Sequence, residues 1–378
     1  MARPLTAVVI GGGIAGLTTA IALDRAGVSV DVYERVDPLG EIGAGISIWL
    51  NAIRAFGEIG LADKIKAFSV PAGDAGLRTW DGRLLVGPSQ STLARRLEDV
   101  AVVMHRADLQ RVLLDAYGRE RVKLGSACVS IAQDDRGATA TFTNGHVAHG
   151  DMLIGADGLH SVVRSALHGD QPPRYSGYTA WRGVVTFDHS KVRPGESWGP
   201  GRRFGQIPMS QSRVYWFATD NVPAGSRAAA GEKAELLRLF RGWHEPIDAL
   251  IDATAAPAIL RNDIYDRPPL ARWGDRRITL VGDAAHPMTP NLGQGACQAI
   301  EDAVELARAL RGAVDVAAAL RAYETARIRR ANRIVEASRR VGWLGQFERR
   351  SAIAARDTFV RLVGGFLQSR AIARMIGA

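Results

Sequence analysis

Three glycines and one acidic residue near the N-terminus have the spacing of a site for phosphate and ribose groups. Gly11 would allow a tight turn, Gly13 would let a pyrophosphate approach the backbone, and Gly16 would let a helix pack closely against a sheet. The N-terminus of that helix would present unpaired N–H groups to the phosphates. Glu34, 23 residues after Gly11, can accept hydrogen bonds from ribose hydroxyls and would repel a 2′-phosphate. We therefore predict dinucleotide binding at this turn.

A second group of residues with chemical potential follows the strand-like run ITLV, far along the chain. Asp283 would end that strand, where its carboxylate could bond a sugar hydroxyl. Two prolines, one of them Pro290, would stiffen the following loop by fixing φ. The backbone from Asn291 to Gly295 would point N–H groups, at a helix start, toward an electron-rich group and favour negative charge there. His286 could carry a proton, although a single loop histidine is more often structural.

A third group lies in two strand-like segments, RRFGQIP and RVYWFATD, which flank the short turn MSQS and should form a hairpin. Alternation along a strand places Tyr215 and Phe217 on one face, and it likewise places Arg203 with Gly205. A shift of one residue would exchange Arg203 for Arg202. The large aromatic residues of this region are expected to pack in a core.

The elements that must position these residues begin as an alternation of strands and helices. Residues 6–10 form a short β-branched run typical of a buried parallel strand. A helical pattern then runs to Gly27, and a second strand ends at Glu34. Residues 43–45 and the segment 46–60 are expected to form a loop and then a helix.

The middle of the chain predicts further strands and helices. Residues 105–118 have the pattern of a helix that ends at a glycine, and residues 128–155 that of a β-meander with a tight turn. A turn and a helix should follow this meander. The later segment predicts a buried strand over 278–281 and a helix from about Gly293.

Composition and charge limit the classes of protein. With 47% hydrophobic and 23% charged residues in 378, the chain is globular, and no run approaches the roughly 18 apolar residues of a membrane span. Two cysteines exclude a disulfide scaffold or a cysteine-based zinc cluster and fit a reducing cytoplasm. Thirteen arginines and four acidic residues after residue 320 account for the whole net charge of +9. A charge excess confined to one segment does not indicate a nucleic-acid binder.

Three motifs in order carry a resemblance to a known family. They are GGGIAG with Glu34, GADGLHSVVR at 155–164 and GDAAHPMTPNLGQG at 282–295. Together they resemble the FAD-dependent aromatic hydroxylases of the para-hydroxybenzoate hydroxylase type, which are single-component flavoprotein monooxygenases, over roughly residues 5–335. The segments YSGYTAWRG and RRFGQIPMSQSRVYWFA look most like urate hydroxylase and salicylate-hydroxylase-like enzymes. The motif at 282–295 is also similar to zeaxanthin epoxidase.

The resemblance implies a fold and an activity. The implied fold is mixed α/β, with a Rossmann-like FAD-binding domain, an inserted β-rich substrate domain and a C-terminal helical segment. We expect the FAD-binding domain to comprise residues 1–72, 100–168 and 272–345, the substrate domain 73–99 and 169–271, and the tail 346–378. The implied activity uses NADH or NADPH, FAD and O2 to hydroxylate a small planar aromatic or heteroaromatic compound through a flavin C4a-hydroperoxide.

The resemblance also implies residue roles. Arg106 matches an arginine that contacts FAD, and Asp157 matches an aspartate near the pyrophosphate and NAD(P)H. A surface arginine and a turn aspartate are the alternatives, and Arg164 fits a structural role. Arg203 would fix a planar anionic or carbonyl-bearing ring by bidentate donation, and Tyr215 would orient it or relay a proton. A solvated arginine and a core tyrosine are the alternatives. No metal ligand is expected. The expected cofactor-binding residues are Gly11, Gly13, Ile14, Ala15, Gly16, Glu34, Arg35, Gly45, Arg106, Asp157, Asp283, Pro290, Gly293, Gly295 and Ala296.

Several alternatives stay open at the level of sequence. One is epoxidation or tailoring hydroxylation of a larger isoprenoid or polyketide, and another is a flavin dehydrogenase or reductase without oxygenation. A non-catalytic flavin-binding protein is a third. The arginine-rich segment 321–378 could lie on an anionic membrane, although packing on the flavin domain with a solvated arginine face is favoured. The expected partners are a small-molecule substrate and O2, without nucleic acid, for a cytoplasmic monomer or homodimer.

Overall fold

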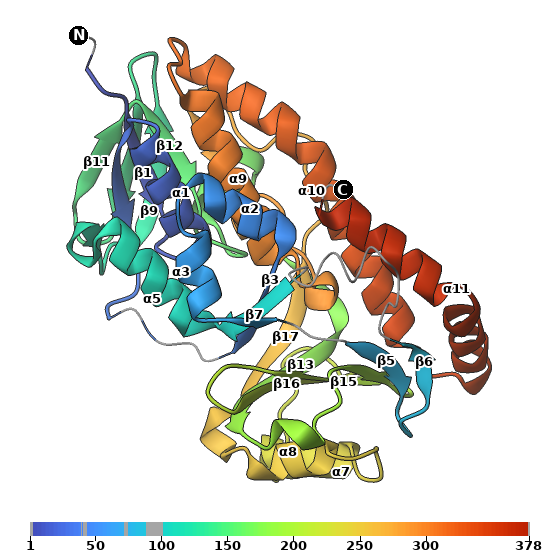
Figure 1. Ribbon diagram of the computed structural model, residues 1–378. Coiled ribbons are helices and arrows are strands. Elements are labelled where there is room, and N and C mark those ends of the chain that lie inside the picture. The colour runs from blue at the N-terminus through green and yellow to red at the C-terminus, as the bar shows by residue number, and fades with distance from the viewer. Residues whose placement is uncertain (1–2, 39, 41–43, 72–74, 88–100, 377–378) are drawn as a thin grey trace.

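The structure is a computed structural model, shown in Figure 1, that describes residues 3–38, 40, 44–71, 75–87 and 101–376, with side chains described up to residue 365. The expected fold class is confirmed, since a parallel sheet, antiparallel sheets and C-terminal helices form a mixed α/β chain. The expected domain boundaries near residues 72–73 and 99–100 lie outside the described residues. The division into domains therefore stays a prediction.

A parallel sheet of five strands, in the order β18-β12-β1-β2-β8, carries the N-terminal glycine turn. Its strands are β1 (Thr6–Ile10), β2 (Ser29–Tyr33), β8 (Val122–Lys123), β12 (Met152–Gly155) and β18 (Ile278–Leu280). Helix α1 (Ile14–Arg25) packs against both α5 (Arg106–Tyr117) and α9 (Gly295–Leu310). The strand, turn, helix and strand expected at the N-terminus are thus confirmed.

The expected meander forms a three-stranded antiparallel sheet that packs against the parallel one. Its strands are β9 (Cys128–Gln133), β10 (Ala138–Phe142) and β11 (Val147–Gly150). The following strand, β12, leaves the meander and pairs with β1 in the parallel sheet, and α6 (Val162–His168) comes after it.

The loop and helix expected over residues 43–60 are partly wrong. Gly45–Trp49 is a strand, β3, which pairs antiparallel with β7 (Ala101–His105). The short strand β4 (Val70–Pro71) completes this sheet, while helices α2 (Leu50–Glu58) and α3 (Ala62–Ala67) follow β3. Pairing with a segment about fifty residues away creates β3, and local sequence carries no sign of such a partner.

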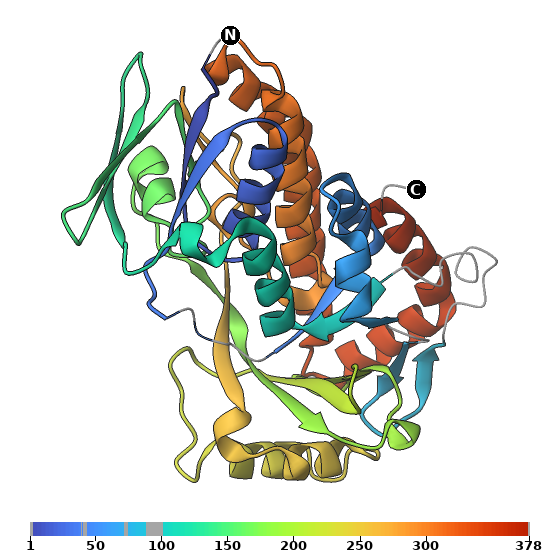
Figure 2. The same cartoon turned by 60° about the vertical axis from the view of Figure 1, so that its left-hand side comes forward.

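A seven-stranded sheet forms the second large layer, in the order β17-β13-β16-β15-β14-β5-β6. Its strands are β5 (Gly76–Thr79), β6 (Leu84–Val86), β13 (Arg174–Thr186), β14 (Gly195–Trp198), β15 (Arg202–Pro208), β16 (Arg213–Asp220) and β17 (Leu260–Asp266). Helices α7 (Glu232–Leu239) and α8 (Ile247–Ala253) cover the face turned away from the parallel sheet (Figure 2). The buried rings of Phe204, Trp216 and Phe240 fill the core between these helices and the sheet, as expected for the aromatic residues.

Two long helices end the chain. Helix α10 (Val316–Gly345) packs on α9, and α11 (Arg350–Ile376) packs on β6 of the seven-stranded sheet. The expected packing of the tail on the flavin domain is seen for α10, whereas α11 packs on both β6 and α2. Within the described ranges, no helix combines the length and the apolarity that crossing a membrane requires.

Candidate active site

A cavity of about 2230 Å³ runs from the glycine turn to the seven-stranded sheet and the C-terminal helices. All the residues expected to bind a cofactor line it except the buried Gly16, which packs behind the turn. Arg203 and Tyr215 line it as well. The structure therefore brings together residues that the sequence separates by more than 270 positions. Their individual contacts decide what each can do.

The glycine turn has the shape of a phosphate cradle. Gly11 has φ of +109°, and a Cβ there would lie 2.5 Å from the carbonyl oxygen of Ala156. A Cβ on Gly16 would lie 1.8 Å from the carbonyl oxygen of Gly11, so the helix could not approach the turn. A Cβ on Gly13 would meet no atom within 4 Å. The protein itself leaves that space free, which fits a ligand held against the backbone.

Glu34 closes one side of the cradle. Its Oε2 accepts a hydrogen bond from the backbone N–H of Gly12 at 2.7 Å, and its Oε1 accepts one from Val36 at 3.0 Å. The carboxylate is therefore fixed beside the turn, at the end of β2, where a ribose would lie. Arg35 is exposed at the same end of the cavity, and Ile14 and Ala15 form the first turn of α1.

The loop that carries Asp283 is held by buried polar contacts behind it. Arg164 is buried and donates to the carbonyl oxygens of Ala284 and Ala285 at 3.0 and 2.9 Å. Burial, with the nearby Arg267, lowers the pKa of Arg164 to about 10. These contacts confirm the structural role expected for Arg164, because they fix the position of the loop that carries Asp283.

His286 lies behind the loop and outside the cavity. Its Nε2 contacts Oδ2 of the buried Asp302 at 2.6 Å, and that oxygen also accepts from the N–H of Gly282 at 3.0 Å. Arg327 donates to Oδ1 of Asp302 at 2.8 Å. Although burial acts to raise the pKa of Asp302, His286 and Arg327 lower it to about 2. His286 thus anchors the loop rather than contacting a ligand.

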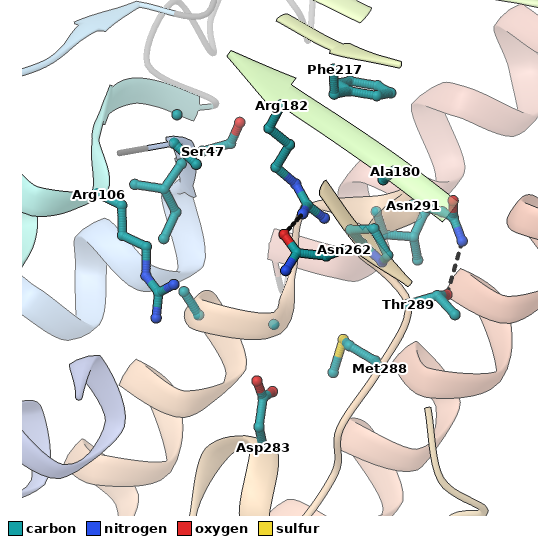
Figure 3. A pocket seen from close by; sticks show the side chains of 18 of the residues that line it. Ser47, Arg106, Ala180, Arg182, Phe217, Asn262, Asp283, Met288, Thr289 and Asn291 are labelled. Atoms are coloured by element: carbon teal, nitrogen blue, oxygen red, sulfur yellow. Dashed lines mark hydrogen bonds between the residues drawn. The ribbon is translucent and has the colours of Figure 1, made fainter. Parts of the chain in front are cut away.

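Asp283 and Arg106 extend into the cavity from different elements, as Figure 3 shows. Asp283 is exposed to the cavity yet surrounded by protein, so burial raises its pKa while His286 and Arg106 oppose that shift. Arg106 is the first residue of α5, and its backbone N–H donates to the carbonyl of Ala44 at 2.8 Å. Both side chains can reach a cofactor that extends from the glycine turn.

The contacts of Asp157 are those of a structural turn residue, which was the alternative to a cofactor contact. Its carboxylate accepts hydrogen bonds from the Ser161 hydroxyl at 2.5 Å and from the backbone N–H groups of Val162 and Val163 at 2.8 and 3.3 Å. It therefore caps α6. Burial raises the pKa of Asp157, and these hydrogen bonds oppose the shift. Because Asp157 also lines the cavity, a contact with a pyrophosphate stays a prediction.

The loop before α9 supplies backbone donors. A 3₁₀ turn spans Pro290–Leu292, Gly293 adopts φ of +60°, and α9 begins at Gly295, two residues later than expected. No side chain caps this helix. Its N-terminal N–H groups, beginning near Gly295 and Ala296, therefore offer a positive dipole end to a group in the cavity.

The pocket face of the seven-stranded sheet has the register that the sequence predicts. Arg203 pairs with Thr219, Gly205 with Phe217, and Ile207 with Tyr215, so these side chains share one face. A Cβ on Gly205 would lie 2.0 Å from the Phe217 ring. Arg202 lies on the other face.

Arg203 is buried, with 2% of its surface exposed, so the alternative of a solvated arginine is wrong. Its Nε donates to Gln346 at 2.7 Å, its Nη2 to Asn291 at 2.7 Å, and its Nη1 to Glu196 at 3.2 Å. Arg203 therefore ties β15 to the end of α10 and to the loop before α9. Its direct contact with a substrate stays a prediction.

Tyr215 is half-buried beneath β3. A Cβ on Gly45 would lie 2.3 Å from Cγ of the Tyr215 ring, so this glycine allows the two strands to meet. Burial raises the pKa of Tyr215, and Arg182 opposes the shift. Whether Gly45 also contacts a cofactor stays a prediction.

Sequence reasoning missed Arg182 and Asn262. Figure 3 shows them joined within the cavity, with Arg182 Nη1 donating to Oδ1 of Asn262 at 3.1 Å. No carboxylate among the described residues lies within ion-pair distance of Arg182, whereas Glu196 neutralises Arg203. Period-two alternation could have found Arg182, because its neighbour Trp181 is a core residue on the opposite face.

Comparisons with known proteins point to a flavin-binding enzyme, as the geometry of this site does. The FAD binding domain family matches residues 5–338. The aurachin C monooxygenase/isomerase of Stigmatella aurantiaca is 40% identical, over 96% of this chain and 95% of the relative. FAD-dependent urate hydroxylase of Klebsiella pneumoniae is 38% identical over 89% of each chain.

Solved structures of similar proteins also indicate an FAD-binding enzyme. HpxO of Klebsiella pneumoniae, in complex with FAD and uric acid, superposes with a TM-score of 0.90 at 36% identity, covering 99% of this chain and 96% of that one. The expected resemblance is confirmed, and FAD is the cofactor that the cradle fits. The chain belongs to the FAD binding domain family and is an enzyme of the FAD-dependent monooxygenase type.

Proposed function

We propose that this enzyme uses NADH or NADPH and O2 to hydroxylate a small planar heteroaromatic compound. The observation that carries the proposal is the single cavity that joins the FAD cradle to the pocket face of the seven-stranded sheet. That face presents Arg182 without a carboxylate partner among the described residues. A ring with an anionic or carbonyl oxygen would complement this guanidinium. Urate hydroxylase, a relative, is named for a heteroaromatic compound of this kind.

The residues would divide the work between cofactor and substrate. Gly11, Gly13 and Glu34 would hold the pyrophosphate and ribose, and Arg106 and Asp283 would contact the part of FAD that extends along the cavity. When bound and reduced, FAD supplies the chemistry that activates O2. The N-terminus of α9 would stabilise negative charge that develops next to it. Arg182 and Tyr215 would orient the substrate ring, and the surrounding protein would exclude water.

The proposal includes the setting in which the enzyme works. Both cysteines are free, which supports a reducing cytoplasm. We propose a small-molecule substrate and O2 as partners, with no nucleic acid and no membrane, and a monomer or a homodimer. The competing activity is a dehydrogenase or reductase that forms product without inserting oxygen.

The test is oxygen uptake and NADH or NADPH oxidation by the FAD-loaded protein. The ligand panel holds urate, salicylate, hydroxybenzoates and hydroxyquinolines. We expect one ring compound to stimulate both rates, and the product formed under ¹⁸O2 to carry one labelled atom. Product without label would overturn the proposal in favour of a dehydrogenase. Reduced FAD that reoxidises at the same rate with every compound would contradict a substrate site in this cavity.

A further inference from the structure

One wall of the cavity comes from helix α11 and is almost entirely apolar. Ala352, Ala355, Phe359 and Val360 line the cavity. The first three are spaced by three and four residues, and Val360 lies eight residues after Ala352, so they share one side of the helix. Figure 1 shows α11 beside β5 and β6. The contact is close, since a Cβ on Gly364 would lie 2.6 Å from Cγ2 of Val86.

The facing walls are apolar too. They are formed by Leu77 and Val86 of β5 and β6 and by Leu344 and Phe347 near the end of α10. We call the part of the cavity between these residues and α11 the apolar recess. The two alanines of α11 leave space between the walls.

The one charged residue that lines the cavity from this face of α11, among those described, is already ion-paired. Arg356 is buried, donates from Nε to Asp357 at 2.9 Å, and lies 5.1 Å from the centre of the Trp198 ring. It also approaches the carbonyl oxygen of Gly345 at 3.5 Å, next to the point where Gly345 packs under Arg203. The charge of Arg356 is therefore paired with Asp357, although its Nη2 has no hydrogen-bond partner among the described residues. The recess continues from the Arg203 region past this ion pair.

The same end of the molecule exposes large apolar side chains to water. Trp343, Phe359 and Leu362 are 67%, 55% and 79% exposed. Exposed apolar surface of this kind marks interaction sites, and ligand-binding grooves are one class of them. Because the recess is continuous with the ring site, a chain attached to the ring can reach it without leaving the protein.

We propose that the apolar recess holds a hydrocarbon chain carried by the heteroaromatic substrate. The inference rests on the proposed function and narrows its substrate class to ring compounds with an aliphatic or isoprenoid substituent. A bilayer or a second copy of the chain would cover the exposed side chains from outside. Neither would enter the recess between α11 and β6.

The test measures how affinity depends on chain length. The probes are 4-hydroxyquinoline and salicylate, each without a chain or with an n-propyl, n-heptyl or n-undecyl chain, titrated into the FAD-loaded protein while flavin absorbance is followed. We expect the dissociation constant to fall with length by up to about fourfold per methylene, the factor that corresponds to about 0.8 kcal/mol per buried CH2. Affinity that is independent of chain length with both heads would overturn the proposal.

Two neighbouring substitutions locate the effect. Ala355→Trp should fill the recess, abolish the gain with chain length and leave binding of the chain-free heads unchanged. Ala354→Trp is the matched control, since both alanines are exposed on the same helix but only Ala355 lines the cavity. Equal effects of both substitutions would show that the hydrocarbon chain binds elsewhere, and they would overturn the proposal.

The outcomes separate this inference from the proposed function. Ligand-stimulated oxygen uptake without dependence on chain length contradicts the recess and leaves the hydroxylase. A dependence on chain length that Ala355→Trp removes, without ligand-stimulated oxygen uptake, contradicts the hydroxylase and leaves the recess.

Discussion

The smallest unit with a testable role is the Glu34 carboxylate, whose two oxygens accept from Gly12 and Val36. Glu34→Gln has one acceptor oxygen in place of two, so one of these contacts is lost along with the negative charge offered to a ribose. Hydrogen bonds to charged groups contribute about 1.5–3 kcal/mol. We expect the FAD dissociation constant to rise about 10- to 100-fold in a fluorescence titration of the apoprotein. Glu58→Gln, in an exposed pair with Arg308, is the control.

Arg182 should decide which substrate charge is accepted. Arg182→Met removes the cation that has no carboxylate partner among the described residues. The long, unbranched side chain of methionine keeps much of the volume. We expect salicylate to bind about 10- to 100-fold more weakly, in line with the loss of a charge-assisted contact, while FAD affinity stays the same. Arg238→Met, exposed on α7, is the control. An equal loss for a neutral ring of the same size would contradict recognition by charge.

At the scale of elements, Asp302 joins the Asp283 loop to α9 and α10. Its folded-state pKa of about 2 lies below the ordinary aspartate value of 3.8, so its stabilising contribution is present above the unfolded pKa and is lost as pH falls toward 2. Asp302→Asn should lower the free energy of unfolding near neutral pH by about 1.5–3 kcal/mol, because His286 and Arg327 lose a charged acceptor while Arg327 keeps its ion pair with Glu301.

Chemical denaturation at several pH values measures both effects. The difference in stability between the native protein and Asp302→Asn should shrink between about pH 4 and pH 2, where the native carboxylate takes up its proton. Asp115→Asn, an exposed pair with Arg119, should show little difference at any pH. A constant difference for Asp302→Asn across this range would show that the carboxylate charge does not stabilise the loop.

Elements also show where sequence reasoning succeeds and where it ends. The glycine turn and the faces of β15 and β16 follow from local spacing, because turn geometry and alternation are properties of a few consecutive residues. Strand β3 was missed because β7, some fifty residues away, creates it. The acceptors of Arg203 were missed for the same reason. Asn291 and Gln346 are separated from it by 88 and 143 positions, and no pattern in the sequence connects them.

On the scale of the whole molecule, the FAD site is built from two segments that lie far apart in the sequence. Residues from the ranges 11–34 and 283–296 line one cavity. Binding to the native state alone stabilises it by about 2.7 kcal/mol at a ligand concentration of 100 times Kd. We expect FAD at that excess to raise the Tm of the apoprotein by several degrees, and the shift to be smaller for Glu34→Gln at the same FAD concentration. Calorimetric scans check this, and an unchanged Tm would contradict FAD binding at this site.

The parallel sheet places β18, which comes late in the chain, beside β12 and so one strand away from β1, the first strand of the sequence. A ribosome that has produced the glycine turn, which ends at Gly16, must still add some 280 residues before it reaches the start of α9 at Gly295. At about 5–20 residues per second, this interval lasts roughly 14–56 seconds. The nascent chain therefore holds half of a cofactor site throughout most of its synthesis. Insertion of FAD is accordingly a late event, and a shortage of flavin would act on newly finished chains.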